Sequence, residues 1–293
     1  LKKNKPWGII LFSRNIYDLF QLKKLIDDIR KTFKDKNYPI LIDQEGGNVS
    51  RLNKIFNLSK FSQSYFGRLY EKDKNNFKYF YKLYINKISQ IFNYVGININ
   101  TVPVLDIRNK KTHNIIKNRT FSQNRKIVSK IGNICIQLYR ENKIATVMKH
   151  IPGHGLSVHD SHLKLPIIKA SKKTLIKNDF KTFKDCNSFF AMTAHIVYQS
   201  YDKLNPATHS KIVIKDVIRK NIGFKGLLIS DDISMKALTK DLSYNAIKAI
   251  DSGCNLVMHC NGNLREMNKI VKVIPTIDNF TRKKTAQFYN FLG

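Results

Sequence analysis

The chain has 293 residues, of which 42% are hydrophobic, so it is long enough to bury a large core. Its formal net charge is +31 at pH 7, but the lysines and arginines are spread along the chain, which favours a biased composition over a dedicated nucleic-acid surface. No apolar run approaches the roughly 20 residues of a membrane helix, and the four cysteines contain no C-x-x-C pair, which predicts reduced thiols in a cytoplasmic protein.

Short apolar runs alternate along the chain with longer segments of helical periodicity. The runs read as parallel strands buried on both faces, and they lie at residues 8–13, 39–43, 100–106, 144–150, 189–195, 226–231 and 255–260. The periodic segments lie at residues 19–33, 127–138 and 213–218. No glycine-rich phosphate turn follows the first strand, so the pattern favours a TIM-type (β/α)8-like barrel over a doubly wound sheet. We expect a single domain spanning residues 1–293.

Residues able to do chemistry stand where the predicted strands stop. An active site at the carboxyl ends of barrel strands is the expected place for them. They are Arg14, Asn15, Asp43, Asp106, Lys149, His150, His195, Asp231 and Asp232.

A loop rich in glycine and histidine follows the strand at 144–150. It begins as KHIPGHG at 149–155 and continues to Asp160 and His162. Residues i and i+2 of an extended loop point the same way, so Asp160 can orient the His162 imidazole for proton transfer. The histidines can equally be plain polar loop residues, and their crowding also fits a zinc site, although Pro152 and the glycines exclude a helical pair of ligands.

Two adjacent carboxylates, Asp231 and Asp232, end another strand. Neighbouring strand residues point to opposite faces, so one carboxylate should face the barrel mouth. A partly desolvated aspartate there is a credible nucleophile for sugar transfer. The competing interpretation is a helix cap, since Asp and Ser234 are favoured in such turns. We expect Asp231 at the strand end and Asp232 or Ser234 supporting the turn.

The segment DQEGG at 43–47 closes the strand at 39–43 and is followed by Arg51. The Asp43 carboxylate can accept bonds from sugar hydroxyls, and the arginine can brace it. By itself this signal is weak, because the paired glycines also make an ordinary turn.

Taken together, these motifs resemble glycoside hydrolase family 3, in particular its bacterial β-N-acetylhexosaminidases. The resemblance runs from about Gly8 to about Asn261 and keeps the motifs in family order. Its blocks are ILFSRN at 10–15, DQEGG, PVLD at 103–106, NRTF at 118–121, KHIPGHG with DSH at 160–162, TAHIVY at 193–198, SDDISM at 230–235 and GCNLV at 253–257.

The resemblance implies a retaining hydrolase that releases terminal β-linked N-acetylglucosamine. It implies Asp231 as nucleophile, His162 as acid/base and Asp160 as its orienting partner. The implied substrate-binding residues are Asp43, Arg51, Arg119, Lys149 and His150. The implied substrates are glycosides that contain N-acetylglucosamine, notably the 1,6-anhydro-muropeptides of peptidoglycan recycling. We expect no cofactor, no metal, no specific nucleic acid and no membrane partner, and we expect a cytoplasmic monomer.

Two features depart from the family pattern. Asn48 stands where arginine is usual, and the ILFSRN block, which fits the second family strand, comes within fifteen residues of Leu1. We therefore expect a first strand, with its loop about 20 residues, to be missing from this chain. The alternative is that residues 1–6, a C-terminal segment or a partner chain fills the gap.

Two other interpretations remain open at this stage. A metal-dependent hydrolase on a similar barrel would need a bound ion and would be sensitive to chelators. A basic nucleic-acid-binding protein would need a contiguous basic face with interleaved aromatic residues.

Overall fold

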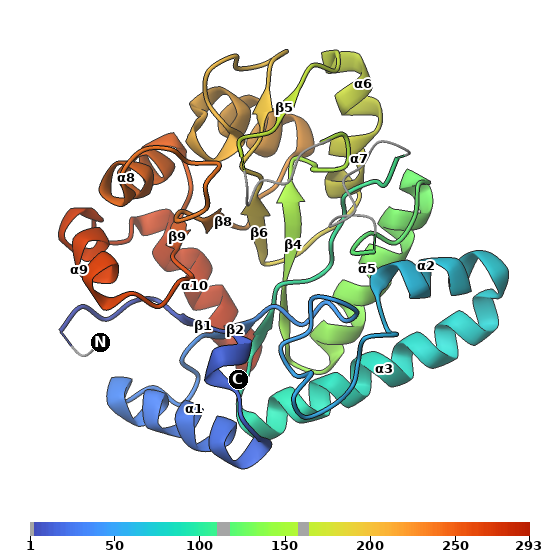
Figure 1. Cartoon of the computed structure of the whole chain (residues 1–293), viewed down its shortest axis with the longest axis vertical. Coiled ribbons are helices and arrows are strands. Elements are labelled where there is room, and N and C mark those ends of the chain that lie inside the picture. Colours follow the sequence, from blue (N-terminus) through green and yellow to red (C-terminus); the bar gives the residue numbers. More distant parts are fainter. Residues whose placement is uncertain (1–2, 110–117, 158–163) are drawn as a thin grey trace.

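The computed structural model describes residues 3–109, 118–157 and 164–293. Its main sheet has seven strands, all paired in parallel, in the order β1–β2–β3–β4–β6–β8–β9 (Figure 1). These strands are β1 Ile9–Leu11, β2 Ile40–Ile42, β3 Ile99–Asn100, β4 Ala145–Ile151, β6 Phe190–Thr193, β8 Leu227–Asp232 and β9 Leu256–Met258. Strand order follows chain order with helices between the strands, which confirms the β/α-barrel class.

The helices surround this sheet (Figure 1). The longer ones are α1 Leu19–Phe33, α2 Gln63–Lys72, α3 Lys74–Val95, α5 Arg125–Glu141, the π-helix η3 Val213–Ile222, α8 Leu242–Ser252, α9 Leu264–Val273 and α10 Asn279–Leu292. The shorter ones are α6 Lys172–Lys177, α7 Asp179–Lys184 and the 3-10 turns η1 Ser13–Asn15 and η2 Ala207–His209. Local capping sets several boundaries; for α1, the Asp18 side chain accepts from Gln21 N, and Lys34 ends the helix in the left-handed conformation.

Every predicted strand overlaps an observed one, but the expected strand at 100–106 is wrong in extent. The ladder from β2 to β4 uses Ile99 and Asn100, so only Asn100 of the predicted segment belongs to it. Beyond it, Val104 makes a single bridge to Lys149, and Pro103 has no N–H to donate to a ladder. Sequence analysis also missed a separate two-stranded sheet formed by β5 (Ile167–Ile168) and β7 (Val197–Tyr198).

Successive strand residues pack on opposite faces of the main sheet. In β2, Ile40 and Ile42 join the core beneath the surrounding helices, whereas Leu41 joins a second cluster on the inner face. In β4, Met148 joins the core beneath the helices, and Val147 joins the inner-face cluster. This alternation explains why the strand runs look continuously apolar, because both faces are covered.

The last helix, α10, packs against the inner-face cluster. Phe288 is fully buried, and its ring centroid lies 5.4 Å from that of Phe190 and 5.9 Å from that of Trp7. The helix is held near the amino ends of the strands, where Asn255 before β9 donates to Thr281 at 3.0 Å and Asn37 before β2 donates to the Gly293 carbonyl at 3.1 Å. A C-terminal segment therefore covers the inner face of the seven-stranded sheet.

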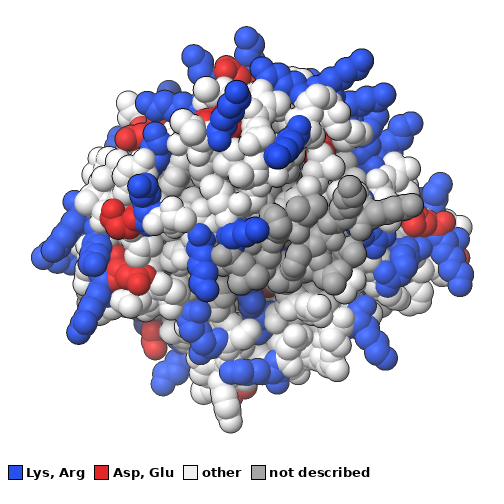
Figure 2. Space-filling model, turned by 45° about the horizontal axis from the view of Figure 1, so that its top comes forward, with Lys and Arg blue, Asp and Glu red and all other residues white. Residues whose placement is uncertain are grey.

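The surface is basic without a single basic stripe on the face that Figure 2 shows. Lysine and arginine side chains are scattered around this face, with a few carboxylates between them (Figure 2). Within the described ranges, no helix combines the length and the apolar character needed to cross a bilayer. The four cysteines are free thiols, and three of them are buried.

Candidate active site

Asp43 lies just beyond the carboxyl end of β2 and is paired with two cations. Arg51 donates to its Oδ2 at 2.9 Å, and Lys149, from β4, lies 3.2 Å from its Oδ1. The Thr101 hydroxyl also donates to this carboxylate. Burial alone would raise the pKa of Asp43, but Lys149 and Arg51 hold it well below its usual range. The carboxylate is therefore ionised at neutral pH, ready to accept further hydrogen bonds.

Glu45, two residues further on, shares Lys149 with Asp43 and is also paired with Arg119. Arg119 donates two hydrogen bonds to the Glu45 carboxylate, at 2.8 and 2.9 Å, and Lys149 Nζ lies 2.7 Å from Glu45 Oε1. Its side chain is only 1% exposed. Burial would raise the pKa of Glu45, but Arg119 and Lys149 lower it to about 2. Lys149 thus bridges two carboxylates, and a bidentate pair fixes the arginine.

His150 extends this network to Asp106. Its Nδ1 lies 2.8 Å from Asp106 Oδ2, and its Nε2 lies 3.4 Å from Arg119 Nη2. Asp106 also accepts from the His154 backbone N–H at 2.6 Å. Since the carboxylate only accepts, Nδ1 donates to it, and this bond fixes the orientation of the ring.

The end of β8 supplies the second side of the site. Asp232 caps the turn, because its Oδ1 accepts from the N–H groups of Ser234 at 3.0 Å and Cys260 at 3.1 Å. The expectation that Asp232 or Ser234 supports the turn is confirmed for Asp232. Asp231 Oδ1 accepts from Asp232 N at 2.8 Å, and its side chain is partly exposed.

His195, after β6, holds the backbone at the end of β8. Its Nε2 lies 3.0 Å from the Asp232 carbonyl, and its Nδ1 lies 2.7 Å from the Thr208 hydroxyl. Burial lowers the pKa of His195, partly offset by the negative charge of Asp231, while His150 lowers it further. The neutral ring therefore donates from Nε2 to the carbonyl and fixes the backbone beside Asp231.

The structure brings together all five residues expected to bind substrate. Together with Glu45 and Asp106 they form a continuous chain of polar contacts. Its order is Arg51, Asp43, Lys149, Glu45, Arg119, His150 and Asp106. Asp160 and His162 lie outside the described residues. Sequence analysis did not assign roles to Glu45, Thr101, Asp106 and His195, although Glu45 stands two residues after Asp43, the spacing that places side chains on one side of an extended segment.

The zinc interpretation requires several metal-ligating side chains close together. Within residues 3–109, 118–157 and 164–293, no three His, Cys, Asp or Glu side chains are grouped closely enough to hold an ion. His159, Asp160 and His162, which the zinc interpretation also needs, lie outside those ranges.

A buried carboxyl group, Asp179 at the start of α7, lies beneath this site. Its side chain adjoins Gly153, where an added Cβ would approach the Asp179 Cβ to 2.7 Å. Asp179 is 3% exposed, and its Oδ1 has no hydrogen-bond partner among the described residues. Burial, reinforced by Asp106, raises the pKa of Asp179 to about 7.

We expect Asp179→Asn to stabilise the protein at pH 8 and to change little at pH 4. A raised carboxyl pKa means that the folded state binds more protons between the ordinary value of 3.8 and about 7, so stability falls as pH rises through that window. The amide avoids the buried charge, and its gain is at most about 4 kcal/mol. Thermal melts at both pH values check this, with the exposed Asp251→Asn as control; equal shifts at pH 4 and pH 8 would contradict it.

Known proteins resemble this chain in sequence and in fold. The model of the glycosyl hydrolase family 3 N terminal domain matches residues 1–286. A β-hexosaminidase of Photobacterium profundum is 33% identical over 295 residues, covering 97% of this chain and 85% of the relative. One of Psychromonas ingrahamii is 34% identical over 292 residues, covering 96% and 81%. The structure of NagZ from Neisseria gonorrhoeae in complex with N-trifluoroacetyl-D-glucosamine superposes with a TM-score of 0.86 at 27% identity, covering 99% of this chain and 85% of that one.

The fold and the polar site at its strand ends, read with these likenesses, define a β/α-barrel glycoside hydrolase. Such enzymes cleave O-glycosyl bonds with side chains presented at the barrel mouth. The chain belongs to glycosyl hydrolase family 3.

Proposed function

We propose that this protein is a retaining β-N-acetylhexosaminidase that releases terminal β-linked N-acetylglucosamine. The observation that carries the proposal is the polar chain from Arg51 to His150 across the ends of β2 and β4. Ionised Asp43 can accept bonds from sugar hydroxyls, while Arg119 and Lys149 can donate to sugar oxygens. The β-hexosaminidase relatives, at 33% and 34% identity, support the same activity.

In the proposed reaction, Asp231 attacks the anomeric carbon and forms a glycosyl-enzyme. His162, oriented by Asp160, gives a proton to the departing oxygen. In the second half, His162 takes a proton from water, which attacks the same carbon and frees Asp231. Net retention follows from two displacements at one carbon. No step requires a metal or a cofactor.

The natural setting that we propose is peptidoglycan recycling in the cytoplasm, with 1,6-anhydro-muropeptides as substrates and a monomeric enzyme. Support comes from the motif resemblance and from the free thiols, since buried unpaired cysteines fit a reducing compartment.

A direct test compares 4-nitrophenyl β-N-acetylglucosaminide with the matching glucoside. The expected result is hydrolysis of the first with a kcat/KM at least about tenfold higher, because a site that binds a substrate polar group discriminates strongly against an analogue lacking it. Equal rates, or hydrolysis of neither sugar, would refute the proposed specificity.

We expect His162→Ala to slow substrates with poor leaving groups far more than those with good ones. A general acid matters most when the departing oxygen is basic, and its removal costs about 10²- to 10⁴-fold. A series of aryl N-acetylglucosaminides of rising phenol pKa measures this as a steeper dependence of kcat/KM on leaving group. His159→Ala, three residues away, serves as the control; a uniform loss across the series for His162→Ala would remove it from this role.

A further inference from the structure

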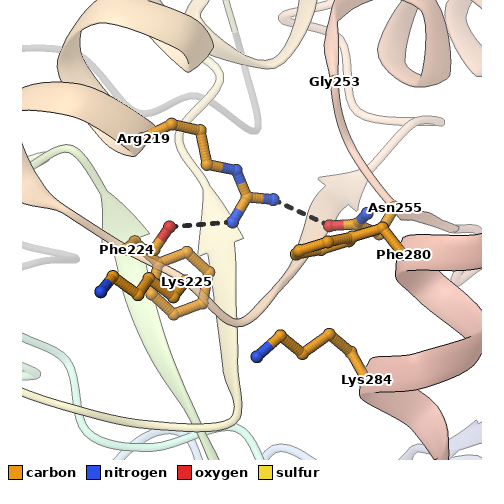
Figure 3. A pocket seen from close by; sticks show the side chains of 7 residues that line it. All are labelled: Arg219, Phe224, Lys225, Gly253, Asn255, Phe280 and Lys284. Atoms are coloured by element: carbon orange, nitrogen blue, oxygen red, sulfur yellow. Dashed lines mark hydrogen bonds between the residues drawn. The ribbon is translucent and has the colours of Figure 1, made fainter.

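A hollow of about 550 Å³ lies at the other end of the barrel, near the amino ends of β8 and β9 (Figure 3). It is formed where η3, the turns before these strands and the first turns of α10 meet. The residues around it are Arg219, Phe224, Lys225, Gly253, Asn255, Phe280 and Lys284. None of them belongs to the polar chain of the active site, and none is acidic.

Arg219 is the most enclosed cation of this hollow. Its guanidinium donates to the carbonyls of Phe224 at 3.0 Å and Gly226 at 2.7 Å, and to Asn255 Oδ1 at 2.9 Å. All three acceptors are neutral. Burial lowers the pKa of Arg219, and the opposing influence comes from the Cys254 thiol rather than from a carboxylate. The positive charge is thus held in place, partly desolvated and without an acidic counterpart among the described residues.

Lys284 brings a second cation to the same space. Its Nζ lies 5.9 Å from the centroid of the Phe280 ring, and the Arg219 Cζ lies 5.6 Å from the same centroid. In Figure 3 both cationic groups lie beside the same edge of this ring, the Arg219 guanidinium above and the Lys284 ammonium below, while the Lys225 ammonium points away from both. Among the described residues, none of these three cations forms a salt bridge. An anion placed here would gain charge-assisted contacts without breaking an ion pair.

We propose that this hollow binds a small phosphorylated metabolite, with its phosphate between Arg219 and Lys284. A phosphate monoester carries up to two negative charges near neutral pH, which two fixed cations can balance. Arginine suits such groups because its planar fork presents several donors at once. The volume falls within the roughly 300–1,000 Å³ of small-molecule sites, so it leaves room for an organic group against Phe224 and Phe280.

A phosphate of a nucleic-acid backbone offers the same charge, but it fits less well. Sequence-independent binding of a strand uses a groove or stripe of cations that follows successive phosphates. Here the cations surround one concave site, and Figure 2 shows scattered basic side chains rather than a stripe on the face that it presents. The test below therefore includes an oligonucleotide as a separate arm.

The experiment titrates the full chain calorimetrically with glycerol 3-phosphate, with glycerol, with inorganic phosphate and with a 12-nucleotide single strand. The expected result is saturable 1:1 binding of glycerol 3-phosphate, weaker binding of inorganic phosphate and none of glycerol. Lys284→Glu should weaken the glycerol 3-phosphate affinity at least about tenfold, because it places a negative charge at the phosphate position. Lys283→Glu, with the same change of net charge on the exposed neighbouring position of α10, should change it less than about twofold.

Thermal melting and the hydrolytic rate identify a folded variant, and Lys284→Gln replaces Lys284→Glu if the latter unfolds. The absence of saturable glycerol 3-phosphate binding would overturn the proposal. So would equal weakening by Lys283→Glu and Lys284→Glu, or saturation by the oligonucleotide alone. N-acetylglucosamine should not compete with glycerol 3-phosphate, since the two sites lie at opposite ends of the strands; competition would also overturn it.

Discussion

Asp231→Ala is expected to lower kcat/KM for 4-nitrophenyl β-N-acetylglucosaminide by at least about 10⁴-fold, as loss of a covalent nucleophile does in comparable enzymes. The fold should survive, because Asp231 lies at the partly exposed end of β8 and is not part of the apolar core. Steady-state kinetics measure the loss of activity, and the far-ultraviolet circular dichroism spectrum measures whether the fold is retained.

Asp232→Asn is the matched control. The Asp232 carboxylate accepts bonds from Ser234 and from the backbone of Cys260, so the amide should weaken the turn and lower the melting temperature. The Asp232→Asn variant should still be labelled by a mechanism-based fluorosugar. Mass spectrometry of the labelled peptide places the sugar; a label on Asp232, or full labelling of Asp231→Ala, would reverse the assignment.

Lys149→Met is expected to have the largest effect on stability. Among the described residues, this substitution leaves Arg51 as the one cation paired with Asp43 and Arg119 as the one cation paired with Glu45. Removing one partner of a buried ion pair typically costs about 3–5 kcal/mol. Sugar binding should weaken too, so KM should rise together with a fall in kcat/KM.

The pH dependence of the stability loss distinguishes the loss of an ion pair from a simple packing defect. The lowered pKa values of Asp43 and Glu45 mean that their stabilisation is fully present above the ordinary carboxyl range and is lost as pH falls towards about 2. The difference between wild type and Lys149→Met should therefore shrink between pH 7 and pH 3.5. Urea unfolding at both pH values tests this, with the exposed Lys130→Met as control; a difference independent of pH would contradict the electrostatic cause.

The sequence predicted the barrel because its signal is local and repeated. Apolar runs and helical spacing alternate; the run at 39–43 encloses β2, and the run at 226–231 covers all of β8 except Asp232. The segment 100–106 was misjudged because apolar residues continue past the point where β3 leaves the ladder. Nothing local in α10 indicates that Phe288 is buried on the inner face of the sheet, since that contact depends on the distant Trp7 and Phe190.

The candidate site was predicted as a set of residues but not as a network. Asp43 and Arg51 are near each other in the chain, whereas Lys149 comes from a strand two places away in the sheet. The motif resemblance placed these residues in one site, yet it did not indicate that Lys149 bridges Asp43 and Glu45. That role follows from burial, since Glu45 needs both cations to remain charged at 1% exposure.

The position of α10 makes the exposure of the two outer strands, β1 and β9, depend on whether this one helix stays attached. The described residues show no pairing of β1 with β9, and the helix instead contacts both margins, through Trp7 before β1 and through Asn255 before β9. Detachment of this one helix would expose both margins and the aromatic side chains between them at once. In hydrogen–deuterium exchange, the amides of α10, β1 and β9 should lose protection with a common opening free energy, below that of the central strands β4 and β6.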